Sequence, residues 1–305
     1  MPILFFLLVL LAGFGSAISG MEKFVAAVMP AGAVHPQRQD FASVALRPFS
    51  AAGKGAPQIL YPIQSHAWPR WLGAGELGGP PAIAICIDDL GEDVARTDQA
   101  MALPRHVTLS FLPFAEATPF LARKALTEGH EVLAHVPMEA EGRQDPGPMT
   151  LEVGASDILT RLSWDVARVP GLSGINNHEG SKFTADPAAL LPVVRFLKKR
   201  HIFFFDSRTT PDSRVVEVAR REGVMSAGRD VFLDDVLDPA AVAHALDALV
   251  AQAKKNGAAI AIGHPHEVTL RVLMAWLAGN HGVRLVPVSQ AIRIKMERKT
   301  MFAGN

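Results

Sequence analysis

Two adjacent carboxylates, Asp88 and Asp89, follow an uninterrupted apolar run in the segment 82–91, which reads AIAICIDDLG. The run is short, rich in β-branched residues and bounded by prolines and a glycine, which is typical of a strand buried on both faces. Two neighbouring acids at the end of such a strand raise each other's pKa, and burial raises both pKa values. A bound metal ion would remove this conflict. The simpler alternative is that an aspartate caps the next helix.

Other polar residues recur at the same kind of position, the carboxyl end of a predicted strand. They are His135 in AHVPMEA, Asn176, Asn177 and His178 in GINNHEGS, Asp206, Ser207 and Arg208 in FFFDSRT, Asp234 and Asp235 in GRDVFLDD, and His264 and His266 in AIAIGHPH. The carboxyl ends of parallel strands converge on one rim of a barrel, where catalytic groups are built. We therefore expect many of these side chains to share one site.

An aspartate and two histidines from separate strands are a common ligand set for a catalytic divalent ion, and Zn²⁺ is the expected ion. Such an ion lowers the pKa of its bound water and polarises a carbonyl oxygen. A second carboxylate beside the ligands can accept a proton from the water, and a histidine across the site can protonate the leaving group.

Eight short apolar segments are predicted as strands: 83–87, 107–111, 132–135, 174–177, 202–206, 224–227, 258–263 and 283–286. Helices alternate with them, and Thr118, Asp186 and Asp238 each precede a proline as predicted N-caps. Seven or eight short βα units predict an α/β fold, a distorted parallel (β/α)7–8 barrel. The one long connection, 138–154, is predicted to be a functional loop over the barrel mouth.

The composition restricts partners and compartment. Lys+Arg and Asp+Glu both number 30 in the 305 residues, so charge gives no indication of a nucleic acid or an anionic membrane as partner. Residues 2–15 are apolar and small residues follow, which resembles a secretory signal without its positive residues. The run is shorter than the about 20 residues of a spanning helix. We predict export, to the periplasm, with an uncleaved membrane anchor as the alternative.

The chain is therefore divided into a signal peptide or anchor (1–20), an Ala/Gly/Pro-rich linker (21–80), a barrel domain (81–295) and a C-terminal tail (296–305). The single cysteine, Cys86, lies inside the first strand and cannot form an intramolecular disulfide. We interpret it as a small buried hydrophobic residue.

As an ordered set, the motifs IDD, HVPME, NNHEGS, FDSRT and GHPH resemble those of the divergent polysaccharide deacetylases, relatives of the NodB-type carbohydrate esterases. The resemblance covers residues 81–292. It implies a distorted barrel and metal-assisted removal of acetyl groups from a polysaccharide. By position in these motifs, Asp88 corresponds to the general base, Asp89 to the metal-binding aspartate, His135 to a metal-binding histidine and His264 to the general acid.

The chain also departs from the NodB-type pattern. A second metal-binding histidine is expected four residues after His135, where this chain has Glu139. His178 is the replacement that the resemblance implies, so the implied metal ligands are Asp89, His135 and His178. The arginine-proline motif that helps to fix the base is missing, and the segment 176–181 takes its place in the chain.

Six residues are assigned to substrate binding: Glu139, Asn176, Asn177, Asp206, Arg208 and His266. Each has a simpler alternative. Asn176 and Asn177 are also turn-forming residues, and Asp206 is also placed to fix Arg208.

The histidines at 264 and 266 flank a proline, so we expect only one of them, His264, to face the site. Arg229 and Asp234 are candidates for a structural ion pair, and the phenylalanines at 203–205 are predicted to be strand core.

The predicted function is an exported, metal-dependent deacetylase that acts on an envelope or extracellular polysaccharide. A non-catalytic periplasmic protein that binds a glycan or a partner is the alternative, because of Glu139 and the missing arginine. A phosphoesterase is disfavoured because Arg208 and Arg229 are nearly the only basic residues in the motifs. A serine triad using Ser181 or Ser207 is disfavoured because neither lies in a nucleophile elbow.

Overall fold

The computed structural model describes residues 79–142 and 146–303. The predicted signal or anchor segment, and the predicted linker up to residue 78, lie outside these ranges. Among the described residues, no helix is both long and apolar enough to cross a membrane.

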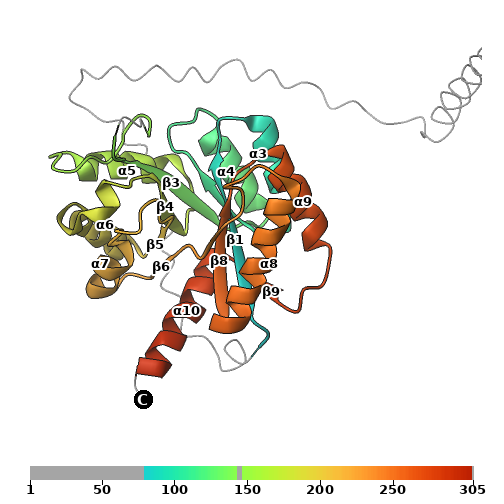
Figure 1. Ribbon diagram of the computed structural model, residues 1–305. Helices are drawn as coiled ribbons and strands as arrows, with labels where there is room; N and C mark the ends of the chain where they lie inside the picture. The colour runs from blue at the N-terminus through green and yellow to red at the C-terminus, as the bar shows by residue number, and fades with distance from the viewer. Residues whose placement is uncertain (1–78, 143–145, 304–305) are drawn as a thin grey trace, which may run out of the picture. The chain divides into compact units, whose positions relative to one another are not determined.

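In the described part of the chain, nine strands form one parallel sheet. The strands are β1 (Ala82–Leu90), β2 (Thr108–Phe111), β3 (Val132–Met138), β4 (Gly174–Glu179), β5 (Phe203–Asp206), β6 (Ser226–Gly228), β7 (Val231–Phe232), β8 (Ala258–Gly263) and β9 (Arg284–Leu285). Their order is β6-β5-β4-β3-β2-β1-β8-β7, and β9 pairs with β1. The sheet curls with helices around it (Figure 1), which confirms the distorted barrel. All eight predicted strands are present; β7 has only two residues and was not predicted.

Eight α-helices and one 3₁₀ turn are described. They are α3 (Val94–Met101), α4 (Thr118–Thr127), α5 (Ile158–Arg168), η1 (Phe183–Ala185), α6 (Pro187–Arg200), α7 (Val215–Glu222), α8 (Pro239–Asn256), α9 (Glu267–Leu277) and α10 (Val288–Ala303). Asp186 and Asp238 cap α6 and α8 as predicted, each accepting two backbone N–H bonds. The predicted cap at Thr118 is wrong. Thr118 is already helical, and its hydroxyl donates to the Leu112 carbonyl at 2.7 Å.

Alternation along β1 divides the core into two clusters. Ile83, Ile85 and Ile87 belong to the cluster beneath the surrounding helices. Ala84 and Cys86 belong to the other cluster, which includes inward residues of β5 and β8 and the apolar residues of α10. Successive side chains of a strand point to opposite faces, so the second cluster fills the inside of the curled sheet, and α10 covers it.

One buried acid, Asp165 on α5, lies outside the predicted site. It is fully buried, and neither carboxylate oxygen has a hydrogen-bond partner among the described residues. Burial raises the pKa of Asp165 well above its ordinary value, and the charge of Arg161 offsets only part of this effect. The folded protein therefore keeps this carboxyl neutral in a pH range where the unfolded chain ionises it.

This pKa difference predicts how an Asp165→Asn variant will behave. Below about pH 4 the carboxyl is protonated in both states, so the variant and the wild type differ by a constant amount. As the pH rises, only the unfolded wild type loses this proton, which favours unfolding. The stability of Asp165→Asn relative to wild type should therefore increase from about pH 4 to pH 7, by about 1.4 kcal/mol for each unit of pKa difference.

Urea unfolding at several pH values in this range measures the effect. Asp247→Asn is the matched control, because Asp247 also lies within a helix, α8, but is exposed. A stability difference for Asp165→Asn that does not change with pH would contradict the assignment of a neutral buried acid.

Candidate functional site

An irregularity at the end of β1 brings two neighbouring carboxylates to the same side of the strand. The register between β1 and β2 shifts between Ile87 and Leu90, and Asp89 has a φ of 58°, in the left-handed region. Such a bulge redirects a side chain that would otherwise point to the opposite face. As a result, Asp88 Oδ2 and Asp89 Oδ1 lie 3.7 and 3.2 Å from the same atom, His135 Nε2.

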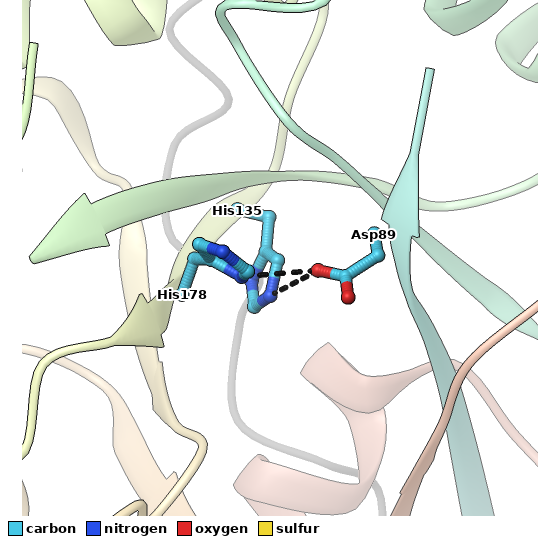
Figure 2. Close-up of side chains that lie close together, drawn as sticks. All are labelled: Asp89, His135 and His178. Atoms are coloured by element: carbon cyan, nitrogen blue, oxygen red, sulfur yellow. Dashed lines mark ion pairs between the residues drawn. The ribbon is translucent and has the colours of Figure 1, made fainter. Parts of the chain in front are cut away.

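Asp89, His135 and His178 point toward one another from β1, β3 and β4 (Figure 2). Asp89 Oδ1 is 3.2 Å from His135 Nε2 and 3.0 Å from His178 Nδ1. The β3–β4 register places His178 beside Pro137, two residues beyond His135, so both histidines lie on the inner face. The predicted ligand residues are thus together, with one donor atom of each within 4.8 Å of the others.

This arrangement fits a divalent ion. Asp89 Oδ1 is buried and accepts no hydrogen bond from the described residues, although two imidazole nitrogens face it. Burial alone would raise the pKa of Asp89, but the two imidazoles hold it well below its usual range. One carboxylate oxygen and two imidazole nitrogens are a donor set that zinc takes in catalytic sites. Asp89, His135 and His178 are therefore the residues that could hold the ion.

Asp88 is buried and is held by neutral donors rather than by an arginine. The Asn176 amide donates to Asp88 Oδ2 at 2.9 Å, and the Cys86 thiol donates to Asp88 Oδ1 at 3.2 Å. Asn176 is itself fixed by Ser110, whose hydroxyl donates to Asn176 Oδ1. Burial, followed by the charge of Asp88, raises the pKa of the Cys86 thiol, so it stays a donor. Asn176 was predicted to bind substrate, but its side chain is fully buried and supports Asp88.

His264 faces the second carboxylate oxygen of Asp89, with its Nε2 3.9 Å from Asp89 Oδ2. Its Nδ1–H donates to Asp234 Oδ1 at 3.0 Å, and Asp234 Oδ2 accepts from the His264 backbone N–H and from Thr269. Burial alone would lower the pKa of His264, but the hydrogen bond to Asp234 and the charges of Asp88, Asp234 and Asp89 raise this pKa to about 9. These partners therefore favour the protonated ring.

One expectation about this region is wrong. Asp234 does not pair with Arg229 but with His264, while the Arg229 guanidinium donates to the backbone carbonyls of Ser207 and Arg208. The ring centroids of His264 and His266 lie 6.0 Å apart. His266 is the N-cap residue of α9.

Four other predicted substrate-binding residues have identifiable contacts. Asn177 Oδ1 accepts the backbone N–H of Ser207, and Asn177 Nδ2 donates to the Glu179 carbonyl. Glu139 pairs with Lys182 and accepts the backbone N–H of Val153, so it anchors the long loop after β3.

Asp206 is buried, and its carboxylate accepts hydrogen bonds from the backbone N–H of Arg208 and from the Ser213 hydroxyl. The bond to Arg208 agrees with the simpler alternative, in which Asp206 fixes Arg208. Arg208 is exposed, with a φ of 54°. Roles in substrate binding stay predictions for Asn177, Glu139, Asp206, Arg208 and His266.

Sequence reasoning missed the supports of the two acid–base candidates. The contact of Cys86 with Asp88 could have been predicted, because Cys86 lies two residues before Asp88 and therefore on the same face of the strand. Ser110 and Thr269 carry no such signal, because each contacts its partner across more than thirty residues of chain.

Comparison with known proteins agrees with the geometry. A family described as divergent polysaccharide deacetylase matches residues 85–292, which include every residue of the candidate site. An uncharacterized protein of Haemophilus influenzae is 34% identical over 197 residues, or 64% of this chain and 70% of that protein. The uncharacterized protein YibQ of Escherichia coli is 36% identical over 193 residues, or 63% of this chain and 60% of YibQ.

A crystal structure is also similar. It is that of an uncharacterized protein from Agrobacterium tumefaciens C58, with 30% identity and a TM-score of 0.68. The superposition covers 75% of this chain and 94% of that structure.

The ligand geometry predicts the metal content of variants. Purified wild type should retain about one divalent ion after dialysis, and His135→Ala and His178→Ala should lose it, because two remaining ligands bind far more weakly than three. Asp88→Asn should retain the ion, because Asp89 supplies the carboxylate ligand. Elemental analysis measures the content, and His244→Ala is the control for an exposed histidine. Unchanged metal content in His178→Ala would remove His178 from the ligand set.

Proposed function

Because the chain belongs to the divergent polysaccharide deacetylase family, we propose that it is a metal-dependent hydrolase that removes acetyl groups from an envelope or extracellular polysaccharide. The observation that carries this proposal is that three candidate metal ligands, the carboxylate of Asp88 and the imidazole of His264 all converge on one site. Asp88 Oδ2 lies 3.7 Å from His135 Nε2, and His264 Nε2 lies 3.9 Å from Asp89 Oδ2. Zn²⁺ is the ion we propose.

A divalent ion held by Asp89, His135 and His178 would supply Lewis-acid activation of water and of the acetyl carbonyl. In our proposal Asp88 accepts a proton from the attacking water. Among the described residues, its two oxygens accept hydrogen bonds from the neutral donors Asn176 and Cys86, and these bonds fix the orientation of the carboxylate. A fixed base within reach of its proton is what general base catalysis requires.

His264 is proposed to protonate the leaving group. Its pKa of about 9 keeps the ring protonated at neutral pH, and its bond to Asp234 leaves Nε2 directed toward Asp89. Asp234 is buried and also fixes the His264 backbone, so the ring and its loop are oriented together. The surroundings of His264 thus favour the protonated ring that a general acid needs.

The proposal predicts a separation of activity from metal binding. Asp88→Asn keeps the shape of the side chain but removes the base, so acetate release should fall by about 10²–10⁴ while the metal content stays near that of wild type. His264→Gln should lose a similar factor because it cannot protonate the leaving group. Acetate release from a panel of acetylated glycans measures both effects.

Asp186→Asn is a control, since Asp186 is the N-cap of α6 and its carboxylate accepts the backbone N–H groups of that helix. Turnover that survives Asp88→Asn would contradict the assignment of the base. A wild type that binds a glycan but releases no acetate from any of them would instead favour the alternative function, a non-catalytic periplasmic glycan- or partner-binding protein.

We also propose export to the periplasm, on the support of the apolar segment 2–15 and the small residues after it. Cleavage after those small residues would remove roughly the first 17 residues. Cell fractionation with mass spectrometry should then find a shortened chain in the periplasm. A full-length chain in the membrane would favour the anchor, and a full-length chain in the cytoplasm would contradict export.

A further inference from the structure

A second group of metal-binding side chains lies beside the proposed ligand set. Asp234, from the segment after β7, and His264 and His266, from the segment between β8 and α9, place one donor atom each within 4.8 Å of one another. We call these three residues the Asp234 group. It has the same composition as the first set, one carboxylate and two imidazoles, and this composition suits Zn²⁺ and similar ions.

His266 is the residue that makes this group more than a support for His264. It precedes α9 as the N-cap residue, but its side chain makes no capping hydrogen bond. Among the described residues, its ring forms no hydrogen bond or ion pair, and it faces the His264 ring at a centroid distance of 6.0 Å. It is also accessible to solvent. An imidazole with free nitrogens beside an Asp–His pair is a third donor that an arriving ion can use.

We propose that the Asp234 group is a second, weaker divalent-cation site, at which the ion replaces the proton between Asp234 and His264. The 3.0 Å between Asp234 Oδ1 and His264 Nδ1 is a separation that two ligands of one ion can share. Binding there has to displace that proton, and Asp234 Oδ2 is already occupied by two hydrogen bonds. Both facts make this site weaker than the first, because metal ions compete with protons for their ligands.

The second site is coupled to the first through Asp89. Asp89 Oδ1 faces His135 and His178, and Asp89 Oδ2 lies 3.9 Å from His264 Nε2. An imidazole that binds an ion at Nδ1 cannot also be an imidazolium, so His264 would lose its function as an acid. Occupation of the second site would thus inhibit the proposed reaction, and excess metal would regulate the enzyme.

Zinc titration of metal-free, full-length protein tests the second site without any substrate. Isothermal titration calorimetry should resolve one tight and one weaker ion in the wild type. His266→Ala should keep the tight ion and weaken the second by more than about tenfold, because it removes one of three ligands. His178→Ala should show the reverse pattern. His244→Ala, an exposed histidine on α8, should leave both ions unchanged.

Two further variants guard against misfolding. His266→Gln keeps the approximate size of the side chain but removes the imidazole. Phe232→Leu is a control next to His264 that leaves all three donors in place. The second site is overturned if wild type binds only one zinc ion at saturation. It is also overturned if the weaker ion persists at the same affinity in both His266→Ala and His266→Gln, because that ion would then be bound elsewhere.

Discussion

The structure depends on the placement of two adjacent carboxylates at the end of β1, the buried Asp88 and the half-buried Asp89. Asp88 and Asp89 both face the inside of the curled sheet beside His135, where like charges repel each other and little water is available to solvate them. Each is compensated in a different way. Asp89 faces two imidazoles from β3 and β4, whereas Asp88 receives hydrogen bonds from Cys86 and Asn176. The surrounding strands therefore have to be in one register, because a shift by a single residue would turn these partners to the other face.

Because their surroundings differ, the two aspartates Asp88 and Asp89 are suited to different chemical roles. The carboxylate among imidazoles has its pKa held well below the usual range and presents a bare oxygen, which suits a metal ligand. The other carboxylate, Asp88, is fixed in orientation by hydrogen bonds from the neutral donors Asn176 and Cys86. Enzymes commonly obtain an acid and a base from similar groups by separating their environments in this way.

At the rim of the barrel, a second group of polar side chains surrounds His264. Its ring is the point where Asp234, Asp89 and His266 come together. The same contacts that raise the pKa of His264 and direct its Nε2 also assemble a set of donors that can bind a cation. In our proposals, protonation and metal binding compete at this ring, so the contacts that support a general acid also provide a means to block it.

The sequence by itself determined the fold class, the position of nearly every strand, and the residues that converge, because apolar runs and polar strand ends are local patterns. Asp89, His135 and His178 were predicted together on that basis and on family resemblance. Only the tertiary structure decided how they face one another. The left-handed backbone at Asp89, the pairing of Asp234 with His264 and the support of Asp88 by Asn176 depend on contacts between distant segments. Such contacts are set by strand register and by the packing of loops at the rim, and a single sequence carries no local pattern for them.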